Sequence, residues 1–294
     1  IMHGLRENTV EGSRENIRAH YDIGNDFFKL FLDETMMYSS ALFPTPETSL
    51  KEASELKIDT ICQRLRLNQN DHLMEIGTGW GSLAIHAAKN YGCQVTTTTI
   101  SQEQFDYARE KVREHGLEKK VNVIFEDYRN LKGTFDKLVS VEMIEAVGLD
   151  HLDHYFKKCS SLLKDQGLMV LQAITIRDQY YESAKNSVDF IQRHIFPGGG
   201  VPSINAMMSA VTKQTDFVML EQQDYAEDYA HTLMHWAKNL NLKNEEITRL
   251  GYPAFLHRLW QYYFAYCEGG FRERAIGVSQ LTLAKTRFRD RRYA

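Results

Sequence analysis

Short apolar runs alternate with longer amphipathic runs through the middle of the chain. The apolar runs predict strands over 72–77, 93–100, 121–127, 137–143 and 167–176. Helical spacing of apolar residues follows over 81–92, 101–116 and 151–164. Ser101 is the predicted N-cap of the second of these helices, with Gln104 in the capping-box position. This alternation indicates an α/β fold, a doubly wound and mainly parallel sheet covered by helices on both faces.

The sequence on either side of this core departs from the alternation. Before it, the pattern predicts helical sequence over 14–34, interrupted by a turn signal at Gly24-Asn25, and a helix over 49–66 with Leu56 among its inward positions. After it, residues 177–220 hold no clean strand and predict a helical lid inserted over the carboxyl edge of the sheet. A strand from 216, helices over 231–242 and 252–270 and a closing strand near 275–285 follow. We therefore expect one domain, made of a helical cap (1–70), a ligand-binding core (71–176), the lid (177–220) and the C-terminal part of the core (221–294).

Composition excludes several classes of protein. The 294 residues are 43% hydrophobic and 25% charged, which is typical of a globular protein and not of a disordered chain. No apolar run approaches the roughly 20 residues that span a bilayer. The net charge of -4 gives no reason to expect nucleic acid. The four cysteines are widely spaced, so we expect reduced thiols, no metal site and a cytoplasmic protein, with native residues preceding Ile1.

A glycine-rich loop carries the strongest local signal. Glu75–Gly81 reads EIGTGWG, leaves the first predicted strand and opens the first predicted helix. Gly77 and Gly79 allow a tight turn beside a ligand, and the helix start offers free N–H groups. The spacing does not match the dinucleotide or phosphate-loop motifs, and no acidic residue stands in 96–99. The loop therefore predicts a smaller nucleoside ligand, chiefly S-adenosylmethionine.

Further motifs in the same order resemble the cyclopropane-fatty-acid synthase family, which includes the mycolic acid cyclopropane synthases. The matching segments are 20–22, 24–28, 32–33, 35–36, 38–39, 75–81, 99–104, 127–129, 139–145, 195–199, 262–263, Cys267 and 271–272. They cover nearly the whole chain. The resemblance implies a Rossmann-like class I methyltransferase that binds S-adenosylmethionine. The residues it places at this cofactor are Tyr38, Ser39, Glu75, Gly77, Thr78, Gly79, Trp80, Gly81, Thr99, Ile100, Ser101, Gln104, Tyr128 and Arg129.

The resemblance also implies the reaction, a methyl transfer to the double bond of an unsaturated fatty acyl chain. Cyclopropane-forming members hold a bicarbonate ion that removes a proton from the new methyl group. The positions matching its ligands are Glu145, Tyr263, Ile174, Ser40 and Gln172. Ser40 stands where the family has Cys, and Gln172 where it has His. We interpret Glu142 as a neighbour of Glu145 in the same turn.

These two departures leave two outcomes open. Either bicarbonate is retained and the product is a cyclopropane fatty acid, or a chain proton is lost and the product is a methyl-branched or methylene fatty acid. The implied partner is an unsaturated fatty acyl chain, either in membrane phospholipid or on a carrier protein, and peripheral contact with the membrane surface is expected. The basic tail 285–294 is either a solvated segment or a contact for anionic lipid headgroups. The sequence leaves a homodimer open. A small-molecule N- or O-methyltransferase and a non-catalytic binding module are the competing interpretations.

Overall fold

The computed structural model describes Gly12 and residues 23–289. The first part of the predicted helix over 14–34, with His20 and Tyr21, lies outside the described residues, as does the end of the basic tail from 290. In the described part, no helix is long and apolar enough to cross a membrane.

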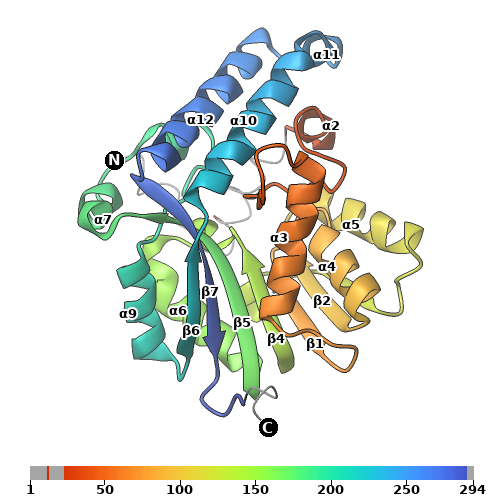
Figure 1. Ribbon diagram of the computed structural model, residues 1–294, viewed down its shortest axis with the longest axis vertical. Helices are drawn as coiled ribbons and strands as arrows, with labels where there is room; N and C mark the ends of the chain where they lie inside the picture. The colour runs from red at the N-terminus through yellow and green to blue at the C-terminus, as the bar shows by residue number, and fades with distance from the viewer. Residues whose placement is uncertain (1–11, 13–22, 290–294) are drawn as a thin grey trace.

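One seven-stranded sheet forms the centre of the molecule (Figure 1). Its strand order is β3-β2-β1-β4-β5-β7-β6. The first five strands in this order are parallel, β7 is antiparallel to β5, and β6 is antiparallel to β7. The strands span β1 His72–Ile76, β2 Gln94–Thr99, β3 Val121–Phe125, β4 Phe135–Val141, β5 Leu163–Ile176, β6 Val218–Asp224 and β7 Ile276–Ala284. The doubly wound, mainly parallel sheet is confirmed.

The strand order places a switch point between β1 and β4, because the chain leaves β1 towards β2 and later returns to β4 on the other side. In open α/β sheets, ligands bind beside the carboxyl ends of the strands at such a point. The loops after β1 and β4 are 77–81 and 142–148. The fold therefore brings the glycine loop beside the segment that contains Glu142 and Glu145.

Helices cover both faces of the sheet and its carboxyl edge. The helices are α2 Asn25–Phe28, α3 Leu50–Arg64, α4 Ser82–His86, α5 Gln102–Glu114, α6 Leu152–Ser161, α7 Asp178–Lys185, α8 Phe190–His194, α9 Ile204–Gln214, α10 Ala226–Leu242, α11 Asn244–Arg249 and α12 Ala254–Arg272. A π-helical turn, Ala87–Tyr91, continues α4, and short 3₁₀ turns span Tyr128–Asn130, Ile144–Ala146 and Leu149–His151. Figure 1 shows α2, α10, α11 and α12 beyond the carboxyl ends of the parallel strands.

An aromatic core joins the N-terminal segment to α10 and α12. Phe27, Phe28 and Phe31 are fully buried, and each ring lies within 6 Å of the Trp260 ring. Burying an aromatic side chain of this size contributes about 2–3 kcal/mol to folding. This core holds residues 25–43 against the carboxyl edge, where Tyr38 and Ser39 meet the sheet.

The structure corrects several local predictions. Leu56 is 39% exposed, so its predicted inward position in α3 is wrong. Ser101 is the N-cap of α5, as predicted, but the Gln104 side chain accepts a hydrogen bond from Thr99 in place of closing a capping box. Within the predicted lid range, α9 packs on α6 at the face of the sheet, while 178–201 lie at the carboxyl edge. The pattern also missed α11, which is only six residues long.

Candidate active site

A cavity of about 730 Å³ opens at the carboxyl edge, between the loops after β1, β2 and β4 and the segment 178–201. α12 closes its far side. Fourteen of the predicted site residues line it. They are Tyr38, Ser39, Glu75, Gly77, Thr78, Gly79, Trp80, Thr99, Ile100, Gln104, Tyr128, Glu145, Ile174 and Tyr263. Gly81, Ser101, Arg129, Ser40 and Gln172 are absent from its lining.

The glycine loop turns sharply beneath the cavity. Gly77 and Gly79 have φ values of +100° and +52°, in the region that side chains disfavour. The N–H groups of Gly77 and Thr78 both donate to the Thr98 carbonyl, which fixes the loop to β2. A Cβ added at Gly79 would meet no heavy atom within 4 Å. The loop therefore leaves open space for a ligand directly over its backbone.

Glu75 presents an unsatisfied carboxyl oxygen at this loop. Its side chain is 4% exposed and lines the cavity, and its Oε2 has no hydrogen-bond partner among the described residues. Burial raises the pKa of this carboxyl group to about 8. A buried acceptor without a donor costs free energy until one is supplied. The ammonium group of S-adenosylmethionine is a donor of the right charge, so the site fits this cofactor.

The ends of β2 and β3 complete the predicted cofactor region. Thr99 Oγ1 donates to Gln104 Oε1 at 2.8 Å, which ties the end of β2 to the first turn of α5. Tyr128 follows β3 and lines the cavity. Arg129 instead forms two hydrogen bonds at 2.8 Å with the buried carboxylate of Asp127. Arg129 therefore braces the turn that presents Tyr128.

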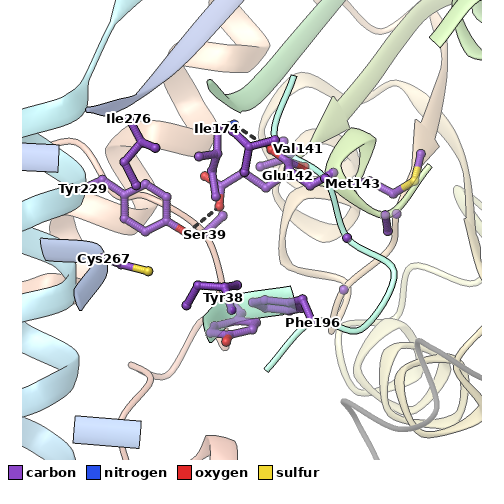
Figure 2. A pocket seen from close by; sticks show the side chains of 18 of the residues that line it. Tyr38, Ser39, Val141, Glu142, Met143, Ile174, Phe196, Tyr229, Cys267 and Ile276 are labelled. Carbon is purple, nitrogen blue, oxygen red and sulfur yellow. Dashed lines mark hydrogen bonds between the residues drawn. The ribbon is translucent and has the colours of Figure 1, made fainter. Parts of the chain in front are cut away.

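Two tyrosines meet across the cavity. The hydroxyl groups of Tyr38 and Tyr263 are 3.2 Å apart, and the Tyr38 ring stacks towards Phe196 (Figure 2). Trp80 donates from Nε1 to Asn25 Oδ1 at 2.7 Å, which links the glycine loop to α2. Segments from both ends of the chain thus meet in one apolar wall of the cavity, formed by Tyr38, Phe196 and Tyr263.

Glu142 lies at the centre of a buried hydrogen-bond network. Its Oε1 accepts from the Ser40 N–H at 2.9 Å and from Gln172 Nε2 at 2.7 Å, and its Oε2 accepts from the Tyr229 hydroxyl at 2.7 Å. Figure 2 shows Tyr229 directed at this carboxylate. The residue lines the cavity and has a φ of +49°, which is unfavourable for a side chain. Such strained residues gather at functional sites, where the surroundings enforce them.

Ser40 and Gln172 are therefore engaged away from the cavity. The Ser40 hydroxyl donates to the Ala41 carbonyl at 3.1 Å. The Gln172 side chain donates to Glu142 and accepts from Gln280 Nε2 at 2.9 Å. Both positions at which the sequence departs from the family's bicarbonate ligands thus contact Glu142, position 40 through its backbone N–H and position 172 through its side chain. The interpretation of Glu142 as a mere neighbour of Glu145 missed this network.

Glu145 has a poorer set of donors. Its Oε1 accepts from the Ile174 N–H at 2.6 Å, and its buried Oε2 has no partner among the described residues. Burial, together with the nearby Glu142, raises the pKa of Glu145 to about 8. A carboxyl group with this pKa is mostly protonated at pH 7. The backbone N–H of Ile174, one of the expected bicarbonate donors, is thereby occupied by a side chain of the protein.

Lys57 is a buried residue of this region that the sequence analysis did not single out. It lies on α3, is fully buried, and donates from Nζ to Ser39 Oγ at 2.6 Å. Lysines are almost never fully buried without charged partners. A signal was available, because Lys57 falls on the inward stripe of α3 with Ser54 and Ile61, at helical spacing.

The fold and glycine loop together define a class I methyltransferase, and comparison with known proteins identifies its family. Residues 9–281 match the family model described as mycolic acid cyclopropane synthetase. The chain is 37% identical to tuberculostearic acid methyltransferase UfaA1 of Mycobacterium tuberculosis, over 95% of this chain and 67% of that protein. It is 35% identical to the cyclopropane-fatty-acyl-phospholipid synthase of Escherichia coli K12, over 91% of this chain and 67% of that protein.

A solved structure agrees with these relatives. Mycolic acid cyclopropane synthase CmaA1, complexed with SAH and CTAB, superposes with a TM-score of 0.87 and 29% identity, covering 92% of this chain and 98% of that one. The chain belongs to the mycolic acid cyclopropane synthetase family, and it is an S-adenosylmethionine-dependent methyltransferase of the cyclopropane-fatty-acyl-phospholipid synthase type.

Proposed function

We propose that this enzyme methylates the double bond of an unsaturated phospholipid acyl chain and releases a methyl-branched or methylene product. The sequence also left open a cyclopropane product formed with bicarbonate, and we favour the methyl-branched or methylene product. The observation that carries it is the network around Glu142. The Ser40 backbone N–H and the Gln172 side-chain amide, at the two positions that differ from the family's bicarbonate ligands, both donate to this carboxylate. In this proposal the Glu142 carboxylate therefore takes the role that bicarbonate has in cyclopropane-forming members of the family.

The cavity-lining residues support the cofactor part of the proposal. S-adenosylmethionine, when bound, supplies an electrophilic methyl group. Glu75 would accept from its ammonium group, the open space at Gly79 would admit it close to the backbone, and Tyr128 would present its ring to the adenine. Thr99 and Gln104 would bind the adenosine hydroxyls. Together with Tyr38 and Ser39, these residues would position the methyl group beside the substrate cavity, and such fixed placement supplies much of the catalysis for a weak nucleophile such as an alkene.

The reaction balances through Glu142. One alkene carbon takes the methyl group as the carbon–sulfur bond breaks, and the other alkene carbon becomes cationic. A proton then leaves a neighbouring chain carbon, its bonding electrons form the new double bond of a methyl-branched alkene, and the Glu142 carboxylate receives the proton. For the methylene product, a hydride first shifts from the methyl-bearing carbon to the cationic carbon, and the proton then leaves the methyl group. The buried carboxylate also stabilises the cation electrostatically, an effect that is strong where water is excluded.

The environments of the two glutamates support this division of roles. Burial raises the pKa of both carboxyl groups, but three donors and the buried Lys57 ammonium oppose the rise at Glu142. Glu145 receives one backbone donor and feels the negative charge of Glu142. When neighbouring carboxyl groups differ in this way, the one with more hydrogen-bond donors and a nearby cation ionises, and the other stays protonated. Glu142 is then the base, and Glu145 a neutral group that positions Ile174.

The residues around Glu142 do not offer a bicarbonate ion the ligands that the resemblance implied. The Ile174 N–H is bonded to Glu145, and Ser40 and Gln172 are bonded within the protein. A second anion beside Glu142 would also meet like charge at close range. In this proposal the proton is therefore removed without bicarbonate.

The acyl chain is proposed to lie along the apolar part of the cavity, between Phe196, Tyr263 and Ile276. A pocket lined mainly by apolar and aromatic groups suits a hydrocarbon chain. The exposed aromatic residues Tyr180 and Tyr266 at its edge support peripheral contact with a lipid surface. A polar substrate for N- or O-methylation would find few partners on this wall.

A variant that restores the family's ligands tests this proposal. Ser40→Cys and Gln172→His return the usual side chains, and Glu142→Gly removes the carboxylate at a position whose φ favours glycine. With monounsaturated phospholipid vesicles and bicarbonate, the triple variant should form cyclopropane lipid, which the parent enzyme does not. The single variant Glu142→Gly serves as the control for removal of the base. A triple variant that still forms only methylated alkene would contradict the proposal.

A further inference from the structure

We propose that Lys57 is a positioning residue of the methyl-transfer site, whose buried ammonium group fixes the segment 38–40 and supplies the positive charge that keeps Glu142 ionised. The effect on the ionisation of Glu142 rests on the proposed function of Glu142. The positioning of segment 38–40 concerns cofactor binding alone and does not depend on that function.

The segment 38–40 connects Lys57 to both halves of the site. Lys57 Nζ donates to Ser39 Oγ at 2.6 Å, and the backbone N–H of the next residue, Ser40, donates to Glu142 Oε1 at 2.9 Å. The preceding residue, Tyr38, reaches Tyr263 on the apolar wall. A shift of this segment would therefore move a cofactor contact, the base and the wall of the substrate cavity together.

The surroundings of Lys57 explain why a charged residue is retained in a fully buried place. Its Nζ has one hydrogen bond to a neutral hydroxyl, while Glu142, Asp33 and Glu75 attract it electrostatically. Burial lowers the pKa of Lys57 to about 8, and these three carboxyl groups oppose that fall. Below about pH 8 the ammonium form is therefore present beside the carboxyl groups of the active site.

Several groups other than Lys57 face Glu142. Tyr229 of α10 donates to it, and burial raises the pKa of this phenol well above its usual value, so it remains a neutral donor. Glu145 adds a like charge only when it ionises. Tyr263 on α12 also interacts electrostatically with Glu142, and burial raises the pKa of this phenol. Among the described residues that act on Glu142, Lys57 is the cation, and its loss would favour protonation of Glu142.

The test compares Lys57→Met with Lys51→Met, which removes an exposed lysine from the same helix. Turnover of vesicles of monounsaturated phosphatidylglycerol is followed between pH 5.5 and 8.5 by release of S-adenosylhomocysteine. In Lys57→Met, the pH at which turnover is half-maximal on the acid side should rise by about one pH unit or more. The KM for S-adenosylmethionine should rise about tenfold. Lys51→Met should leave both quantities unchanged.

Two further variants separate the two roles and remain informative if Lys57→Met does not fold. Ser39→Ala removes the hydroxyl group, so it should raise the KM for S-adenosylmethionine and leave the acid-side midpoint in place. Lys57→Arg keeps the charge, so it should keep that midpoint. A folded Lys57→Met variant with the parent's midpoint and KM would overturn the proposal. If Lys57→Met is unfolded, an unchanged KM in Ser39→Ala or a displaced midpoint in Lys57→Arg would overturn it.

The variant Glu142→Gln separates the role of Glu142 as base from the role of Lys57 in positioning the cofactor segment. If Glu142→Gln retains the parent's turnover, Glu142 is not the base and the pH part of the role falls with it. The KM effect of Lys57→Met and Ser39→Ala would still establish the positioning of the cofactor segment, and its absence would refute it.

Discussion

Gln172 and Glu142 are bonded through both side chain and backbone at the carboxyl ends of β5 and β4. The Gln172 amide nitrogen donates to Glu142 Oε1 at 2.7 Å, and the Glu142 N–H donates to the Gln172 carbonyl at 2.8 Å. The side-chain oxygen of Gln172, Oε1, accepts from Gln280 Nε2 on β7 at 2.9 Å. The Gln172 side chain therefore connects the Glu142 carboxylate to β7.

Replacement of the two glutamates by glutamine should have unequal effects. Glu142→Gln removes the proposed base and its charge, so turnover should fall about 10²-fold or more. Glu145→Gln replaces a carboxyl group that is mostly neutral at pH 7, and its amide oxygen can still accept from Ile174, so the loss should be about tenfold or less. Steady-state turnover at saturating S-adenosylmethionine measures both. Equal losses, or a larger loss at Glu145, would reverse the assigned roles.

The glycine loop should control cofactor affinity. Gly79→Val places a branched side chain in the open space over the loop, and we expect S-adenosylmethionine affinity to fall at least tenfold, about 1.4 kcal/mol. Gly116→Val is a matched control, because Gly116 also has a positive φ of +64° and no heavy atom within 4 Å of an added Cβ, but lies outside the cavity. Calorimetry on both folded variants separates backbone strain from contact with the cofactor. Similar affinities in the two variants would remove Gly79 from the binding site.

Cofactor binding should release a proton at pH 7. Burial raises the pKa of Glu75 to about 8, so this carboxyl group is mostly protonated in the free enzyme and must ionise to bind an ammonium group. Calorimetry in buffers with different ionisation enthalpies should show release of up to about one proton per cofactor at pH 7, with less release at pH 9. Glu75→Gln should bind more weakly and without this release. Binding by the parent enzyme with no proton release would exclude the assigned contact.

The sequence predicted the sheet and the turn of the glycine loop well, because their signals are local. Apolar runs predicted the parallel strands, and Gly77 and Gly79 predicted a tight turn, which their positive φ values confirm. The role of Glu142 was not predictable in this way, since it depends on donors from Ser40, Gln172 and Tyr229, which are far apart in the chain. Their meeting depends on the strand order and on the aromatic core that holds 25–43 over the sheet.

Two smaller errors have similar causes. Leu56 matches the helical pattern, yet the cap leaves that face of α3 in contact with solvent. The burial of Lys57 was not predicted because a charged residue is typical of a surface position, although its spacing places it on the buried stripe of the same helix. In both cases the tertiary contacts of the helix decided which face was inward.

The product of the parent enzyme is the most direct test of whether Glu142 or bicarbonate removes the proton. Monounsaturated phospholipid vesicles are incubated with enzyme and S-adenosylmethionine in buffer freed of bicarbonate and in buffer supplied with it, and the lipids are analysed by proton NMR. Cyclopropane ring protons resonate far upfield of alkene protons, so the two products are distinguished although they have the same mass. If Glu142 removes the proton, the product is a methylated alkene in both buffers, formed at the same rate. Cyclopropane lipid formed only when bicarbonate is supplied would contradict the proposed role of Glu142.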